Sequence, residues 1–161
     1  MTLYAGIDPG LSGALSVILP TGEVRFYDTP TIEVTSGKRK RRQFLVAQMV
    51  HLLTPYATGE VQVALEQVAS RPGQSSVATF SFGQGYGCWI GILAAMGIPV
   101  TFVIPQTWKK AMAVTGDKGA AIVRATQLFP ATAKDLTLVK HHGRADSLLI
   151  AAWLRQKNGG G

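Results

Sequence analysis

Apolar residues alternate with small or polar residues over three short segments at the start of the chain. These segments cover residues 3–8, 14–19 and 23–27, and the sequence PTGE at 20–23 has the composition of a tight hairpin turn. Alternation with a period of two is typical of strands that bury one face. The pattern therefore predicts three strands, each antiparallel to the next.

From residue 43 onward the apolar positions follow helical spacing, interrupted by two strand-like segments. The spacing predicts helices near 43–56, 86–97, 106–112, 117–129 and 143–156. Strands are predicted over 61–68 and 99–105, the basic segment 35–43 is predicted as a loop or a helix entrance, and 69–85 as a long loop. This order indicates an α/β domain with a central mixed five-stranded sheet, three antiparallel strands and then parallel ones, flanked by helices.

The composition is that of a globular protein. The chain has 161 residues, of which 47% are hydrophobic and 16% charged, and we expect one domain over 1–157 with a flexible tail at 158–161. The single cysteine, Cys88, excludes an internal disulfide and a multi-cysteine zinc site. The sequence shows no signal or transit pattern and no apolar run of about 18 residues, so we expect a cytoplasmic protein without membrane contact.

The net charge of +7 favours a polyanionic partner such as nucleic acid, although basicity alone does not identify one. Five consecutive basic residues stand out: Lys38, Arg39, Lys40, Arg41 and Arg42. Such a run is either a phosphate-binding segment or a solvated charged loop, and we favour phosphate contact.

A carboxylate lies on the apolar face of the last expected helix. Asp146, Leu149, Ile150 and Trp153 follow one another at helical spacing, and His142 lies one turn earlier on the same face. An ionised group that faces a core is costly unless it is paired or binds a metal. A partner for Asp146 is therefore expected.

Two more acids end strands with matching parity. Asp8 shares a strand face with Gly6, and Glu66 shares one with Ala64. The small residues leave space for an element that lies across the sheet, and the helix of Asp146 is the candidate. The three acids would then converge.

Converging carboxylates repel one another unless a cation lies between them. Oxygen ligands with one imidazole suit Mg²⁺, with Mn²⁺ able to substitute, and two ions about 4 Å apart can hydrolyse a phosphodiester. Each residue also has a structural interpretation: Asp8 as part of an Asp-Pro-Gly turn, and His142 as a solvated histidine at a helix start.

The motifs GIDPGLSGAL, ALEQV and HHGRADSLLIAAW, in this order and spacing, resemble those of the RuvC-type Holliday junction resolvases of the RNase H-like fold. The segments PGQSSVATFSFGQGYGCWIGIL and TWKKAM are similar to the bacterial, phage and chloroplast (monokaryotic-chloroplast) branch. The resemblance covers roughly residues 3–153 and implies a bacterial or phage-encoded, metal-dependent, homodimeric endonuclease that makes paired nicks across four-way DNA junctions. It implies no small-molecule cofactor.

The resemblance also implies roles for single residues. It makes Asp8, Glu66 and Asp146 catalytic metal ligands for two ions. Many RuvC enzymes have a fourth ligand three residues before the helix acid, where this chain has Gly143, so His142 or His141 must substitute. Lys118 matches a lysine of the resembling branch and could neutralise charge at the scissile phosphate; an ordinary surface lysine is the alternative.

Further candidate DNA contacts lie beyond the basic run. The loop expected after Glu66 carries a possible base reader, Gln74, and two aromatic rings for stacking on unpaired bases, Phe80 and Phe82. Simple packing under a loop is the alternative for the two rings. Arg71 in this loop, and Lys109 and Lys110 in TWKKAM, complete the predicted DNA-binding set.

Two other classes share features of the sequence. Actin-like and sugar-kinase-like ATP-binding proteins also begin with an acid and glycines between two strands, but they need a second related half that 161 residues cannot contain. A non-catalytic junction-binding module is the other alternative, and the presence of all the acids argues against it.

Overall fold

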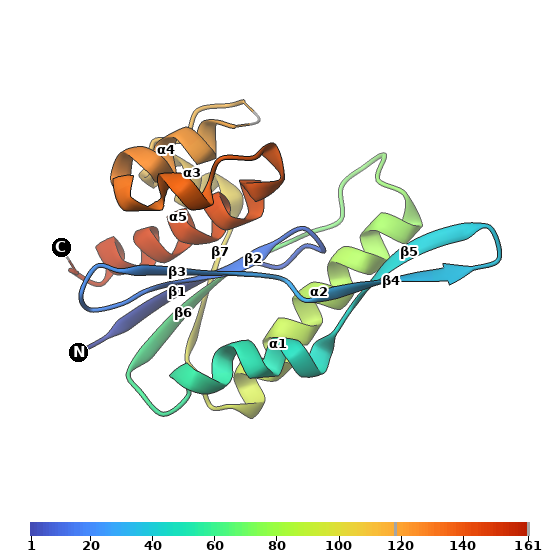
Figure 1. Ribbon diagram of the computed structural model, residues 1–161, viewed down its shortest axis with the longest axis horizontal. Helices are drawn as coiled ribbons and strands as arrows, with labels where there is room; N and C mark the ends of the chain where they lie inside the picture. Colours follow the sequence, from blue (N-terminus) through green and yellow to red (C-terminus); the bar gives the residue numbers. More distant parts are fainter. Residues whose placement is uncertain (118, 161) are drawn as a thin grey trace.

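The protein, described by a computed structural model over residues 1–117 and 119–160, is built on one five-stranded sheet with helices on both faces (Figure 1). The strand order is β3-β2-β1-β6-β7, with bounds Val24–Asp28, Ala14–Ile18, Leu3–Asp8, Val61–Glu66 and Val100–Val103. Strands β1, β2 and β3 are antiparallel neighbours, and β6 and β7 continue parallel to β1. The predicted mixed sheet is confirmed.

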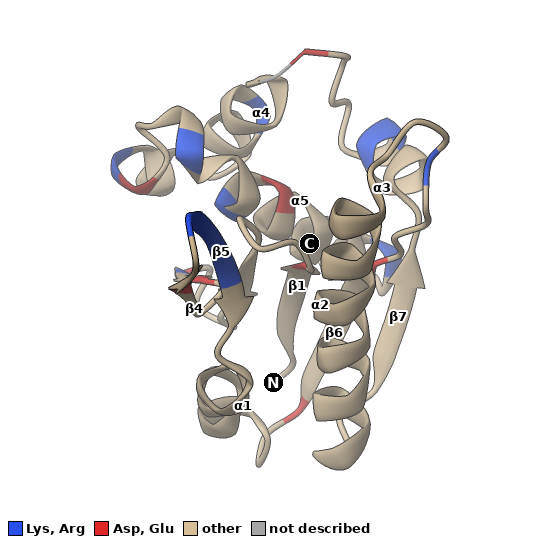
Figure 2. Ribbon diagram, turned by 90° about the vertical axis from the view of Figure 1, so that its right-hand side faces the viewer, with Lys and Arg blue, Asp and Glu red and all other residues tan. Residues whose placement is uncertain are grey.

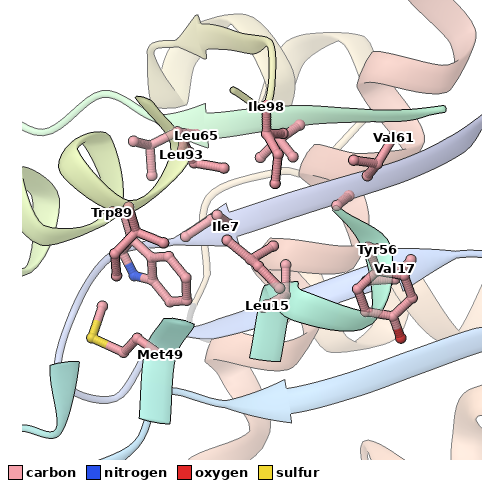
Figure 3. Packing of buried hydrophobic residues seen from close by; sticks show 14 of the residues in the cluster. Ile7, Leu15, Val17, Met49, Tyr56, Val61, Leu65, Trp89, Leu93 and Ile98 are labelled. Atoms are coloured by element: carbon pink, nitrogen blue, oxygen red, sulfur yellow. The ribbon is translucent and has the colours of Figure 1, made fainter. Parts of the chain in front are cut away.

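The helices form a layer on each face of this sheet (Figure 1). They are α1 (Val46–Leu53), α2 (Ser76–Ala95), α3 (Pro105–Ala111), α4 (Ala120–Leu128) and α5 (His142–Lys157), with short 3-10 turns at Thr54–Tyr56, Pro130–Asp135 and Val139–His141. On one face Trp89 and Leu93 of α2 and Met49 of α1 pack on strand residues such as Ile7 and Leu65 (Figure 3). Helix α5 packs on the other face. No helix in the described residues combines the length and apolarity that a membrane crossing requires.

Helix α5 lies directly across the small residues of the two central strands, as predicted. Gly6 pairs with Ala64 in the β1–β6 register. A Cβ atom on Gly6 would overlap the carbonyl oxygen of Ser147 and lie 2.5 Å from the backbone nitrogen of Ala151. The absence of a side chain at Gly6 therefore sets how closely the helix approaches the sheet, and with it the position of Asp146.

The basic segment predicted as a loop is instead a two-stranded hairpin, β4 (Thr31–Ser36) and β5 (Arg39–Phe44), separate from the main sheet. Gly37 turns the chain with a φ of 62°. Every β5 residue except Phe44 is exposed, so no apolar alternation marks this strand in the sequence. Since the hairpin includes residues 43 and 44, the following helix is shorter than the predicted 43–56.

The long loop predicted over 69–85 is also wrong in its second half, because α2 begins at Ser76. The Ser75 hydroxyl accepts a hydrogen bond from the Ala78 N–H at 3.1 Å and caps the helix. Glycines at 83 and 85 obscured the helical pattern. Gly85 is required by packing, since its Cβ would overlap the carbonyl oxygen of Pro9 and lie 2.5 Å from the ring of Phe44.

Candidate active site

The three predicted acids gather at one edge of the sheet. Asp8 ends β1 and Glu66 ends the neighbouring parallel strand β6, so both lie at the carboxyl edge. Asp146 reaches the same edge from the second turn of α5. The structure brings ligand atoms of Asp8, His142 and Asp146 within 4.8 Å of one another, a group that could hold a metal ion.

Glu66 lies beside this cluster and is oriented by a tryptophan. The indole Nε1–H of Trp108, on α3, donates to Oε2 of Glu66 at 2.6 Å. Trp108 is fully buried, so its ring offers a fixed donor. The motif TWKKAM contains this tryptophan, but no role in the site was predicted for it; a tryptophan directly before two lysines was the signal that the sequence offered.

The acids share a low-dielectric environment that favours their protonated forms. Burial raises the pKa of Asp8, against a smaller opposite effect from the Gly10 N–H, which donates to its Oδ1 at 3.3 Å. Burial, and then the negative charge of Asp8, raises the pKa of Glu66 to about 7. The same two causes, with the charge of Glu66 added, raise the pKa of Asp146 to about 7. Such pKa values in one cleft mark a candidate functional site.

The structure distinguishes between the two adjacent histidines. Nδ1 of His141 accepts a hydrogen bond from the Leu138 N–H at 3.2 Å, which directs that ring toward the preceding turn. His142 is exposed and takes part in the cluster with Asp8 and Asp146. Of the two predicted alternatives, only His142 belongs to this group in the described residues, and its role as a metal ligand stays a prediction.

Packing explains why a glycine, Gly143, lies between the two histidines and Asp146. A Cβ on Gly143 would overlap the carbonyl oxygen of Ser12 and lie 3.0 Å from Cα of Gly13. The loop over residues 9–13 therefore passes against the start of α5 where a larger residue would project. A ligand cannot occupy position 143 unless this loop moves.

A groove of about 760 Å³ is lined by Asp8, His142 and Asp146 of the cluster together with residues of β5 and of the first turns of α2. Figure 2 shows β5 and α2 on either side of β1. Phe80 and Phe82 line it and are 74% and 43% exposed, although they lie on helix α2 and not on the predicted loop. Lys40, Arg41 and Arg42 form part of the opposite wall. The groove thus has one basic and one aromatic side, with the acids at its base.

The other predicted residues within the described part of the chain are not among those that line the groove. The side-chain oxygen of Gln74 accepts a hydrogen bond from the Arg71 N–H at 3.3 Å, and the charge of Arg71 lowers the pKa of Glu66. The charge of Lys109 lowers the pKa of all three acids, and its Nζ lies 5.4 Å from the ring centre of Trp108. Lys110 lies next to it in the last turn of α3, and Lys38 and Arg39 lie at the turn of the hairpin. The predicted catalytic Lys118 and Gly161 of the predicted tail lie outside the described residues.

The raised pKa values predict how stability depends on pH when no divalent metal is bound. Glu66 and Asp146 titrate near 7 in the folded state and near 4 in the unfolded state, so the folded protein holds protons that the unfolded chain releases. The stabilisation is complete below about pH 4 and is lost as pH rises through about 7. We expect the melting temperature in a chelator to fall between about pH 5.5 and about pH 8, and Mg²⁺ to restore it at the higher pH.

The double variant Glu66→Gln, Asp146→Asn is the control for this measurement. It should lose most of the pH dependence and most of the response to Mg²⁺, because neither amide titrates or supplies a charged ligand. A double variant with the wild-type pH profile would assign the dependence to other groups.

The chain is similar in sequence to one known protein and in fold to solved structures. The chain matches no family model. It is 39% identical over 84 residues to the chloroplastic Holliday junction resolvase MOC1 of Chlamydomonas reinhardtii, a match over 51% of this chain that spans only about 10% of the relative's length. Because the relative is chloroplastic, the cytoplasmic location expected for this chain remains a prediction.

Two solved structures share the fold over almost the whole chain. Thermus thermophilus RuvC in complex with a Holliday junction substrate superposes with a TM-score of 0.61 at 18% identity, over 99% of this chain and 98% of that one. A second Thermus thermophilus RuvC structure gives a TM-score of 0.55 at 19% identity, over 98% and 96%. The chain therefore has the RNase H-like fold in the form found in RuvC, and the resemblance predicted from its motifs is confirmed.

Proposed function

We propose that this protein is a metal-dependent endonuclease that resolves four-way DNA junctions by paired nicks. The observation that carries the proposal is the convergence of Asp8, His142 and Asp146, with Glu66 beside them, at the base of a groove with a basic wall. The junction as substrate is supported by the relatives, one a Holliday junction resolvase and one solved with a junction bound.

The residues of the cluster suit a hard divalent cation. Asp8, Glu66 and Asp146 offer carboxylate oxygens and His142 one nitrogen, a set that fits Mg²⁺ or Mn²⁺, and we propose two ions per site. When bound, the metal supplies an activated water and stabilises the leaving oxygen. Trp108 holds Glu66 in place, and Lys109 offsets the negative charge of the acids. Both effects keep the carboxyls ready as ligands.

In this proposal a DNA strand lies in the groove, with its phosphates at the basic wall and its bases at the aromatic wall. Arg41 lines the groove and contacts phosphates, and the exposed Arg39, with Lys38 at the hairpin turn, extends this basic surface beyond the groove. Phe80 and Phe82 stack on bases that are unpaired at the crossover. The amide nitrogen of Gln74 reads a base edge, since its oxygen is bonded to the Arg71 N–H. Gln74→Ala should flatten the sequence preference of cleavage with little change in junction affinity.

Paired nicks require two active sites, which a two-fold homodimer provides. Gly83, Gly87 and Gly91 lie at helical spacing on α2, and open space surrounds the Cβ position of each. Beside them a groove of about 350 Å³ between α1 and α2 is lined by apolar residues such as Val46 and Val50. We propose this face of α2 as the contact between subunits. A fully active protein that sediments only as a monomer at micromolar concentration would refute the dimer.

The function is tested by cleavage of an end-labelled four-way junction with Mg²⁺, beside a linear duplex of the same sequence. We expect symmetric nicks in the junction and none in the duplex. Junction binding without any nick would favour the non-catalytic module, and ATP hydrolysis without nicking would favour the kinase-like alternative.

We expect His142→Ala to lower the cleavage rate by about 10- to 100-fold at a fixed, low Mg²⁺ concentration, with partial recovery at high Mg²⁺. The exposed imidazole is one of several ligands, so its loss weakens the metal site without removing it. His141→Ala is the matched control and should leave the Mg²⁺ dependence of cleavage nearly unchanged, because His141 is bonded to Leu138. Equal effects of the two substitutions would contradict the assignment of His142.

The double variant Arg39→Gln, Arg41→Gln should bind the junction more weakly. The slope of the logarithm of its binding constant against the logarithm of salt concentration should be smaller by about 2, since each lost phosphate contact reduces this slope by about 0.9. The cleavage position should not change, because phosphate contacts carry no sequence information. The double variant Lys134→Gln, Lys157→Gln removes the same charge away from the groove and should keep the wild-type slope. An unchanged slope for the Arg39, Arg41 variant would mean that the hairpin is only a solvated arm.

A further inference from the structure

Arg42 differs from the other basic residues of the hairpin because its guanidinium is already bonded within the protein. Its Nη2 donates to the carbonyl oxygen of Leu11 at 2.7 Å, and its Nη1 donates to the hydroxyl of Ser12 at 2.9 Å. Its Nη2 and Nε also donate to the hydroxyl of Thr31, on the paired strand β4, at 3.0 and 3.3 Å. One side chain thus joins both strands of the hairpin to the loop over residues 9–13.

That loop is the segment that follows the first acid of the site. Its Gly10 N–H donates to Asp8, and its Gly13 approaches the Asp8 carbonyl so closely that a Cβ would overlap it. On its other side the loop lies against Gly143, next to His142. A displacement of this loop therefore moves Asp8 and the start of α5 relative to each other.

Within the described residues, no hydrogen bond joins the neighbouring basic side chains of the hairpin to the 9–13 loop. Lys40 forms an exposed ion pair with Glu33 at 3.2 Å, which is easily exchanged for a phosphate contact. Within the described residues, no hydrogen bond or ion pair of the side chains of Arg39 and Arg41 meets the usual distance limits. The hairpin thus carries free cations beside one cation with a fixed intramolecular role.

We propose that Arg42 is a positioning residue, which holds the 9–13 loop against the hairpin and thereby sets the distance between Asp8 and His142. This inference rests on the proposed nuclease function and deepens it. Because the same hairpin presents Arg39 and Arg41 to DNA, contact with phosphates and the geometry of the metal cluster are coupled through the Arg42 side chain. We call the hydrogen bonds of Arg42 to Leu11, Ser12 and Thr31 the Arg42 strap. A misplacement of about 1 Å at a reacting site can cost about 100-fold in rate, so loss of the strap should have a measurable effect on cleavage.

The test compares Arg42→Gln with Arg41→Gln, which removes the same charge from the adjacent position of the same strand. Dissociation constants for the junction are measured in a chelator, and single-turnover cleavage rates at saturating protein with Mg²⁺. We expect Arg41→Gln to act mainly on the dissociation constant. The saturated rate of Arg42→Gln is expected to lie about 10-fold or more below that of Arg41→Gln.

A third variant, Ser12→Ala, removes one acceptor of the strap and leaves every charge in place. It should slow the saturated rate in the same direction as Arg42→Gln, by a smaller factor, with an unchanged salt dependence of binding. This variant also keeps the test valid if Arg42→Gln does not fold.

A readout without DNA separates this inference from the function on which it rests. The Mn²⁺ concentration that gives half of the maximal thermal stabilisation should be severalfold higher for Arg42→Gln than for Arg41→Gln. If wild-type protein nicks no junction, the proposed function fails, while the difference in Mn²⁺ midpoints still supports the strap. Equal saturated rates and equal Mn²⁺ midpoints for Arg41→Gln and Arg42→Gln would overturn it and make Arg42 an ordinary phosphate contact.

Discussion

Asp8→Asn is expected to lower junction cleavage by more than about 1,000-fold while junction binding survives. The amide keeps the size of the carboxyl but removes the charge that the proposed metal ions require, and single groups that stabilise transition-state charge already contribute about 100- to 1,000-fold. Asp8 contributes to the cluster with both His142 and Asp146, so its loss affects the whole site. Binding should be kept or strengthened, because one negative charge near the phosphates disappears.

Cleavage is measured under single-turnover conditions with Mg²⁺, and binding by mobility shift in a chelator. Asp135→Asn is the matched control, since it makes the same isosteric change outside the groove, and it should cut at the wild-type rate. An Asp8→Asn protein that cuts normally would remove the acid cluster from the mechanism. An Asp8→Asn protein that no longer binds the junction would indicate that the substitution disturbs the fold.

Gly6→Ala is expected to destabilise the protein by about 3 kcal/mol or more, a large share of the stability of a small domain. The added Cβ would overlap backbone atoms of Ser147 and Ala151, which cannot rotate away as a side chain can. Helix α5 must then lift from the sheet or the domain must unfold. Either outcome separates Asp146 from Asp8, so cleavage should also fall in any protein that remains folded.

Urea denaturation measures this effect as a shift of the midpoint at constant slope. Gly59→Ala is the matched control, because a Cβ there would meet its nearest neighbour, a methyl carbon of Leu3, at an ordinary 3.7 Å. Its stability should change by less than about 1 kcal/mol. A Gly6→Ala protein as stable as Gly59→Ala would mean that α5 does not rest on β1 as described.

The sequence determined those features that depend on local period and on strand parity. Asp8 with Gly6, and Glu66 with Ala64, identified the face of the sheet and the side from which a helix approaches. The helical spacing of Asp146 with buried Leu149 and Ile150 identified that helix as α5. These inferences succeeded because an element that buries one face has apolar residues at regular spacing. A charged residue at one of those positions is therefore easily recognised.

The tertiary structure alone decided the features that have no such period. Strand β5 is exposed except for Phe44, so its backbone pairing is invisible in the order of its side chains. Glycines obscured the helical pattern in the first half of α2, and one of them, Gly85, is required by contacts with Pro9 and Phe44, which are far away in the sequence. The proximity of His142 to Asp8 and the bonds of Arg42 to the 9–13 loop depend on segments that meet only in the folded chain. Contacts between residues 30 or more positions apart leave no local pattern, because only the packing of the elements brings those residues together.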